Sequence, residues 1–147
     1  MDASVVRLPT VGSGVAVVLA DVADATTAAT EVMVSRDGGS SWTITGLLPP
    51  QNGGAPIDLV APDRWLAWYA TTADTQALME TTDQGQTWHP VRPQGLPPGA
   101  DVKSLSFPTP TYGWALVDIE STQGYLSGQL FATADAGATW TWLTTAP

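Results

Sequence analysis

Three aspartates recur in the same short setting, and their spacing suggests a shared chemical role. Asp37, Asp83 and Asp135 stand 46 and 52 residues apart, each inside an eight-residue pattern. A glycine follows each aspartate by two positions, a hydroxyl residue by four and a tryptophan by five. A carboxylate in such a turn can accept hydrogen bonds from exposed backbone N–H groups, or it can supply an oxygen ligand to a calcium ion.

The calcium interpretation is the weaker of the two. Ca²⁺ takes six to eight oxygen ligands, usually from several carboxylates close in sequence. Each eight-residue pattern contains a single acidic residue. We therefore predict that the aspartates form turns, and that the chain holds no metal and no cofactor.

Other polar residues provide little support for catalysis. Asp21 with Asp24, and Asp118 with Glu120, are acidic pairs of the kind that glycoside hydrolysis needs, but the sequence favours solvated turns after strands. His89 is the only histidine, cysteine is absent, and no G-x-S-x-G or phosphate-binding glycine pattern occurs. No catalytic residue is predicted, although enzymatic activity stays open.

Each pattern lies within a repeat of four expected strands. The segments on either side alternate in polarity, which is typical of a β-hairpin whose turn is the pattern itself. Further upstream come nearly continuous apolar runs, expected to be middle strands buried on both faces, at 15–22, 65–70 and 113–119. Before each run lies one more candidate strand that closes on proline, at 4–9, 56–62 and 102–108.

Composition agrees with an all-β fold and excludes two classes of function. The 147 residues are 44% hydrophobic and 13% charged, with seven Trp, 14 Gly and 12 Pro, which favours strands and turns over helices. The net charge of −9 leaves no basic patch for nucleic acid. No apolar stretch approaches the roughly 20 residues that span a bilayer, so no membrane insertion is expected.

The pattern S/T-x-D-x-G-x-S/T-W resembles the Asp-box, or bacterial neuraminidase repeat, of sialidases, sortilin-type receptors, xyloglucan-cleaving hydrolases and photosystem II assembly factor-like proteins. These proteins are β-propellers, so the resemblance implies three four-stranded blades at about 3–48, 55–93 and 101–145. It also implies that the box is a structural staple on the outer rim. The box residues are Ser35, Asp37, Gly39, Ser41, Trp42, Thr81, Asp83, Gly85, Thr87, Trp88, Thr133, Asp135, Gly137, Thr139 and Trp140.

Activity of the sialidase kind would imply an arginine cluster, and the arginines here do not recur at one blade position. Surplus aromatic rings are the better candidates for a binding surface, because exposed rings stack on sugars or anchor protein partners. Trp68 and Trp114 are expected in the core. The candidate binding residues are Arg7, Trp65, Tyr69, Tyr112 and Trp142.

Three blades are too few to close a propeller, whose rings typically hold four to eight. The middle strands of the first and third blades would each expose an apolar face. We expect either a homodimer that completes a six-bladed ring or further blades of a parent chain. The favoured function is a non-catalytic scaffold or binding module for a glycan or protein, with a sialidase-like or xyloglucanase-like glycoside hydrolase as the alternative. No signal peptide is visible, and the resemblance favours an extracellular, periplasmic or cell-surface location.

Overall fold

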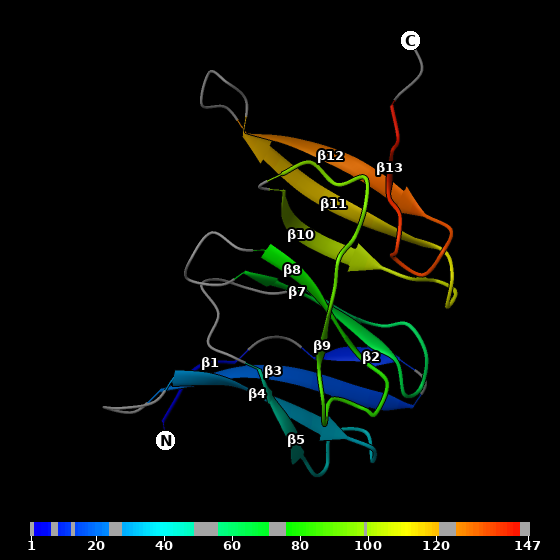
Figure 1. Cartoon of the computed structure of the whole chain (residues 1–147). Helices are drawn as coiled ribbons and strands as arrows, with labels where there is room; N and C mark the ends of the chain where they lie inside the picture. The colour runs from blue at the N-terminus through cyan, green and yellow to red at the C-terminus, as the bar shows by residue number, and fades with distance from the viewer. Residues whose placement is uncertain are drawn as a thin grey trace.

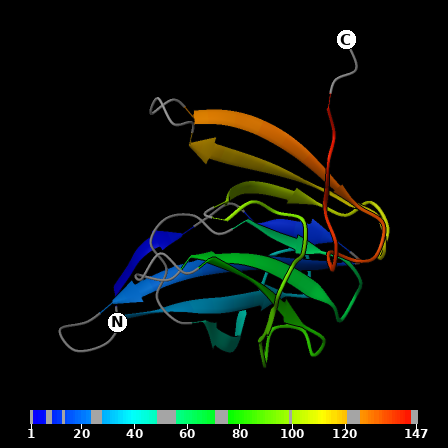
Figure 2. The same ribbon diagram turned by 45° about the horizontal axis from the view of Figure 1, so that its top comes forward.

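The computed structural model describes residues 2–6, 9–12, 14–23, 28–48, 56–70, 76–98, 100–120 and 126–144. In these ranges the chain forms thirteen β-strands and no helix, which confirms the predicted all-β class. The strands build three antiparallel sheets. The sheets stack in chain order, with the second between the first and the third (Figure 1, Figure 2).

The first sheet contains β1 (Asp2–Val6), β2 (Thr10–Gly12), β3 (Val15–Ala23), β4 (Ala28–Ser35) and β5 (Thr43–Leu48). Its order is β1-β3-β4-β5, with β2 also paired to β3. A single innermost strand was expected at 4–9, whereas the structure has two segments on either side of Pro9. A proline has no N–H to donate to the ladder, which accounts for the interruption.

The second and third sheets are four-stranded meanders. The second contains β6 (Ile57–Leu59), β7 (Trp65–Ala70), β8 (Gln76–Thr81) and β9 (His89–Val91). The third contains β10 (Asp101–Ser106), β11 (Gly113–Glu120), β12 (Leu126–Thr133) and β13 (Thr141–Trp142). This arrangement is compatible with propeller blades, in which each chain segment runs from an inner to an outer strand.

Two apolar cores hold the stack together, one at each junction between sheets. Between the first and second sheets, Val17, Leu19 and Val32 pack with Leu59 and Trp65. Both tryptophans of β7 are buried, but they point to opposite junctions because side chains alternate along a strand. The middle strand β7 is therefore covered on both faces, as its continuous apolar run predicts.

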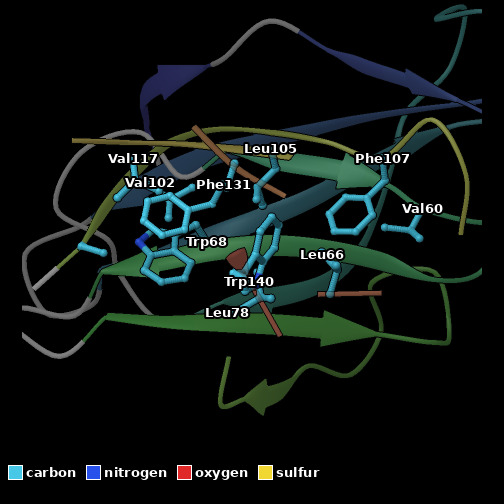
Figure 3. Packing of buried hydrophobic residues seen from close by; sticks show 12 residues of the cluster. Val60, Leu66, Trp68, Leu78, Val102, Leu105, Phe107, Val117, Phe131 and Trp140 are labelled. Carbon is cyan, nitrogen blue, oxygen red and sulfur yellow. The ribbon is translucent and has the colours of Figure 1, made fainter. Parts of the chain in front are cut away.

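The second core lies between the second and third sheets (Figure 3). Side chains from β7 and β8 meet side chains from β10, β11 and β12 there. Phe107 and Trp140 contact edge to face, with ring centroids 6.0 Å apart and an interplanar angle of 80°. Because Trp140 closes the third Asp-box, this contact anchors the turn to the inner strand.

Candidate functional site

The second Asp-box shows how the pattern closes its turn. Asp83 Oδ1 accepts the backbone N–H of Thr87 at 2.8 Å, and Asp83 Oδ2 accepts the Thr87 hydroxyl at 2.6 Å. The Trp88 indole N–H donates to the carbonyl of Gly85 at 3.2 Å. The predicted bond from a backbone N–H to the carboxylate is thus present, and the hydroxyl donates a second bond to the same carboxylate.

The first hydroxyl residue of the box has a role that the sequence reasoning missed. Thr81 is fully buried, donates its hydroxyl to Asp83 Oδ1 at 2.8 Å and accepts the N–H of Gly85 at 2.9 Å. Ser35 and Thr133 make the same two bonds in the other boxes. The sequence feature that could have indicated this role is the position of the hydroxyl residue at the end of an alternating strand, where a polar residue lies on a buried face.

These bonds lower the pKa of the box carboxyls. The pKa of Asp37 falls to about 2, mainly through the side-chain hydrogen bond from Ser41, with further bonds from the backbone of Ser41 and the hydroxyl of Ser35. The pKa of Asp83 also falls to about 2, with the hydroxyl of Thr87 as the largest cause. The pKa of Asp135 is lowered in the same way. A charged acceptor bonded by several donors favours its ionised form.

The turn also needs left-handed backbone at two successive positions. The glycine two residues after the aspartate has a φ of 94° in the first box, 87° in the second and 89° in the third. The preceding residue is left-handed as well, including Gln84 and Ala136, both at 61°. The backbone of these two residues is strained, because a residue with a Cβ disfavours the left-handed region that glycine adopts freely.

The second and third boxes also lie at the junction with the preceding sheet. A Cβ placed on Gly85 would lie 2.9 Å from Val32 Cγ1 of the first sheet, and one on Gly137 would lie 3.4 Å from Leu78 Cδ2 of the second. Both glycines are buried, whereas Gly39 of the first box is exposed. The Asp-box is therefore a connector between sheets as well as a turn within one.

Additional contacts attach the third box to the second sheet. Gln94 accepts the N–H of Trp140 at 2.8 Å and donates to the carbonyl of Ala138 at 2.9 Å, forming a parallel bridge. Arg64 donates to the carbonyl of Ala136 at 3.0 Å. The segment after β9 thus takes part in packing between the second and third sheets.

The outer face of the third sheet is apolar and exposed. Trp114 pairs with Ala132 and Leu116 pairs with Leu130, so the four side chains share one face. Ala115, Val117 and Phe131 alternate with them and point into the core with the second sheet. Trp114 is 42% exposed, and Leu116 and Leu130 are each 43% exposed. The expectation that Trp114 lies in the core is wrong, because no described element covers this side of β11.

The first sheet differs from the expectation that its middle strand is exposed. Val18 and Ala20 on the outer side of β3 are buried, and each pairs with a longer neighbour on β4, Met33 and Glu31. Exposed apolar side chains occur on the flanking strands instead, at Val11 of β2 and at Ile44 and Leu47 of β5.

Of the five predicted binding residues, three have side chains within the described part of the chain. Trp65 is 0% exposed in the core between the first and second sheets, which contradicts a ligand-binding role, and its indole N–H has no hydrogen-bond partner among the described residues. Tyr112 and Trp142 are exposed, at 58% and 52%. Tyr69 belongs to β7, but its side chain lies outside the described residues, as does Arg7.

Three of the four paired acidic residues lie within strands, where turns were predicted. Asp21 lies within β3 and accepts the Thr30 hydroxyl at 2.7 Å, while Asp118 and Glu120 lie within β11. Asp24 lies outside the described residues. The described part of the chain contains no cluster of three His, Asp or Glu that could hold a metal ion.

Asp58 connects two inner strands. Its carboxylate accepts the N–H of Leu59 at 2.9 Å and the N–H of Phe107 from the third sheet. Burial raises the pKa of Asp58, although both hydrogen bonds act against the rise. The arrangement is a structural tie between β6 and the end of β10, because each carboxylate oxygen is used by a backbone N–H.

Three stacked antiparallel sheets, each with one hairpin turn closed by the same hydrogen-bonding scheme, are compatible with propeller blades. The BNR/Asp-box repeat model matches residues 79–90, which include the whole second box. The chain thus carries a BNR/Asp-box repeat, and the first and third boxes share its geometry. No curated protein matches the chain. Among the described residues there is no helix that could cross a membrane.

Proposed function

We propose that the chain is a non-catalytic Asp-box module that presents the outer face of its third sheet to a protein partner. The observation that carries the proposal is the exposure of Trp114, Leu116 and Leu130 on one continuous face. Soluble monomers rarely expose contiguous apolar patches of this kind unless the patch binds something.

A protein partner suits this face better than a glycan. Sugar sites combine an aromatic platform with several convergent polar groups that fix the hydroxyls. Here the aromatic ring of Trp114 is followed by leucines, and Leu143 extends the apolar row beside Leu130. Aliphatic side chains around an aromatic anchor are typical of a protein interface.

The geometry of the described residues does not favour the hydrolase alternative. Arg64 contacts Glu80 and the carbonyl of Ala136, and Arg36 contacts Gln84, so both guanidinium groups serve packing between sheets. A carboxylate-binding arginine cluster, which the sialidase resemblance would imply, is not formed by these residues.

Hydrolysis assays on fluorogenic sialosides and β-glucans, run beside a glycan array, test the proposal. We expect no turnover and no glycan binding. Turnover that Arg7→Ala abolishes would establish the hydrolase instead. Glycan binding that Trp114→Ala abolishes, with the fold retained by circular dichroism, would replace the protein partner by a sugar.

A further inference from the structure

The three repeats can be placed on one another by their strand register. The hydroxyl residue that opens each box pairs with a residue of the middle strand: Ser35 with Ala16, Thr81 with Trp65 and Thr133 with Gly113. Counting from these pairs gives three sets of equivalent positions that face the next sheet. They are Val17, Leu66 and Trp114; Leu19, Trp68 and Leu116; and Val32, Leu78 and Leu130.

The first two members of every set are covered, and the third is not. In the first and second sheets these six side chains are 0–6% exposed, because the next sheet packs on them. In the third sheet the equivalent Trp114, Leu116 and Leu130 are 42–43% exposed. The third sheet thus presents the same kind of face that its two predecessors bury.

The box contact of this junction is open on the first sheet, although Val18 and Ala20 of the middle strand are buried there. In both junctions within the chain, a box glycine contacts the member of the third set that belongs to the preceding sheet: Gly85 contacts Val32, and Gly137 contacts Leu78. Gly39 is the equivalent glycine of the first box. The nearest atom to a Cβ on Gly39 is Trp42 Cζ2 of its own turn, at 4.0 Å.

We propose that the outer face of the third sheet docks the first sheet of a second copy of this chain, head to tail, with Leu130 against Gly39 of the second copy. The proposal rests on the proposed function, and it names the protein partner. It continues a junction that the chain already forms twice, between sheets one and two and between sheets two and three. Two copies joined at both ends would place six blades in a ring, within the range of known propellers.

A head-to-tail contact explains more of the structure than a symmetric contact between two third sheets. A symmetric contact would cover Trp114, Leu116 and Leu130 but leave the first box of each copy without a neighbour. Met33 lies on the face of the first sheet that a head-to-tail contact would cover. Its register equivalents are Met79, which is partly buried in the second sheet, and Phe131, which is buried in the third.

Sedimentation equilibrium of the full 147-residue chain tests the proposal. We expect a single species of twice the 15.3 kDa chain mass. Leu130→Glu places a charge on the outer face of the third sheet, and Met33→Glu places one on the outer face of the first sheet. Each variant should weaken association roughly a hundredfold or more. Ser127→Glu on the other side of β12 is the matched control and should leave the mass unchanged.

Mixing the two variants distinguishes a head-to-tail contact from a symmetric contact between two third sheets. Each variant keeps one intact face, so an equimolar mixture should form a one-to-one complex although neither variant associates alone. Circular dichroism and thermal unfolding of each variant check that the fold is kept. The proposal would be overturned by any of four results. These are a monomeric wild-type chain, a polydisperse aggregate, a dimeric Met33→Glu variant, or a mixture of the two variants that stays monomeric at millimolar concentration. A monomeric wild-type chain would not contradict the proposed non-catalytic function. Turnover of a sialoside or β-glucan would contradict that function, but it would not change the molecular mass measured by sedimentation.

Discussion

Gly46 of the first sheet and Gly85 of the second Asp-box are in direct backbone contact. A Cβ placed on Gly46 would lie 2.0 Å from the carbonyl oxygen of Gly85, which is far inside any allowed separation. The turn of one repeat is therefore seated on the last strand of the repeat before it. This contact shows why a turn motif also determines how neighbouring sheets stack.

Gly46→Ala should destabilise the chain by about 1–3 kcal/mol, because the added methyl forces the two backbones apart. Urea unfolding followed by circular dichroism measures the change. Gly128→Ala is the control, since a Cβ there would lie 3.7 Å from Leu116 Cδ1, an ordinary contact. We expect that variant to be neutral or slightly stabilising. An equal loss of unfolding free energy in both variants would show that the contact between Gly46 and Gly85 does not account for the effect.

Thr81→Val should remove about 1–3 kcal/mol of stability, because the isosteric valine leaves the buried N–H of Gly85 without an acceptor. Thr87→Val also removes a hydroxyl from the second box, but this hydroxyl is exposed and water can replace it at Asp83. Chemical denaturation of both variants should therefore show a clearly larger loss for Thr81. The reverse order would contradict the role of Thr81 as the buried centre of the turn.

Ala136→Gly should stabilise the chain by about 0.5–1 kcal/mol. Left-handed backbone costs an alanine about 1–2 kcal/mol, which exceeds the extra chain entropy that a glycine loses on folding. Ala132→Gly in the regular part of β12 is the matched control and should destabilise by about 0.5–1 kcal/mol. Differential scanning calorimetry gives both values, and a lower melting temperature for Ala136→Gly would contradict the prediction.

Stability should fall in acid through the three box carboxyls. Their pKa values in the folded chain are lowered, to about 2 for Asp37 and Asp83, from an ordinary value of 3.8. The unfolded state therefore binds protons first, and the stabilisation present above pH 4 is lost as the pH falls toward 2. Asp83→Asn should make the fall in unfolding free energy over this window shallower. An unchanged slope would show that the carboxylate of Asp83 is not the titrating group.

The fold class and the form of each repeat could be predicted from the sequence because they depend on interactions between residues close in the chain. Each box bond joins atoms only two to four residues apart, so Thr81, Asp83 and Thr87 contact one another wherever the hairpin forms. The apolar run of β7 likewise indicated a strand covered on both faces. The run of β11 has the same appearance, but one of its faces is exposed, since a pattern of apolar residues does not say whether a neighbour is present.

The amino-acid sequence by itself determined the box turns and the order of the repeats, because these depend on residue types within a few positions of one another. It did not predict that the innermost strand of the first repeat is divided in two. Only the tertiary structure decided which of the similar tryptophans are buried. Trp65 is enclosed between two sheets while Trp114 is open, and the difference lies in contacts with residues distant in the chain. The same holds for the boxes: one local pattern forms all three turns, but Gly85 and Gly137 contact the sheet before their own, whereas Gly39 is exposed.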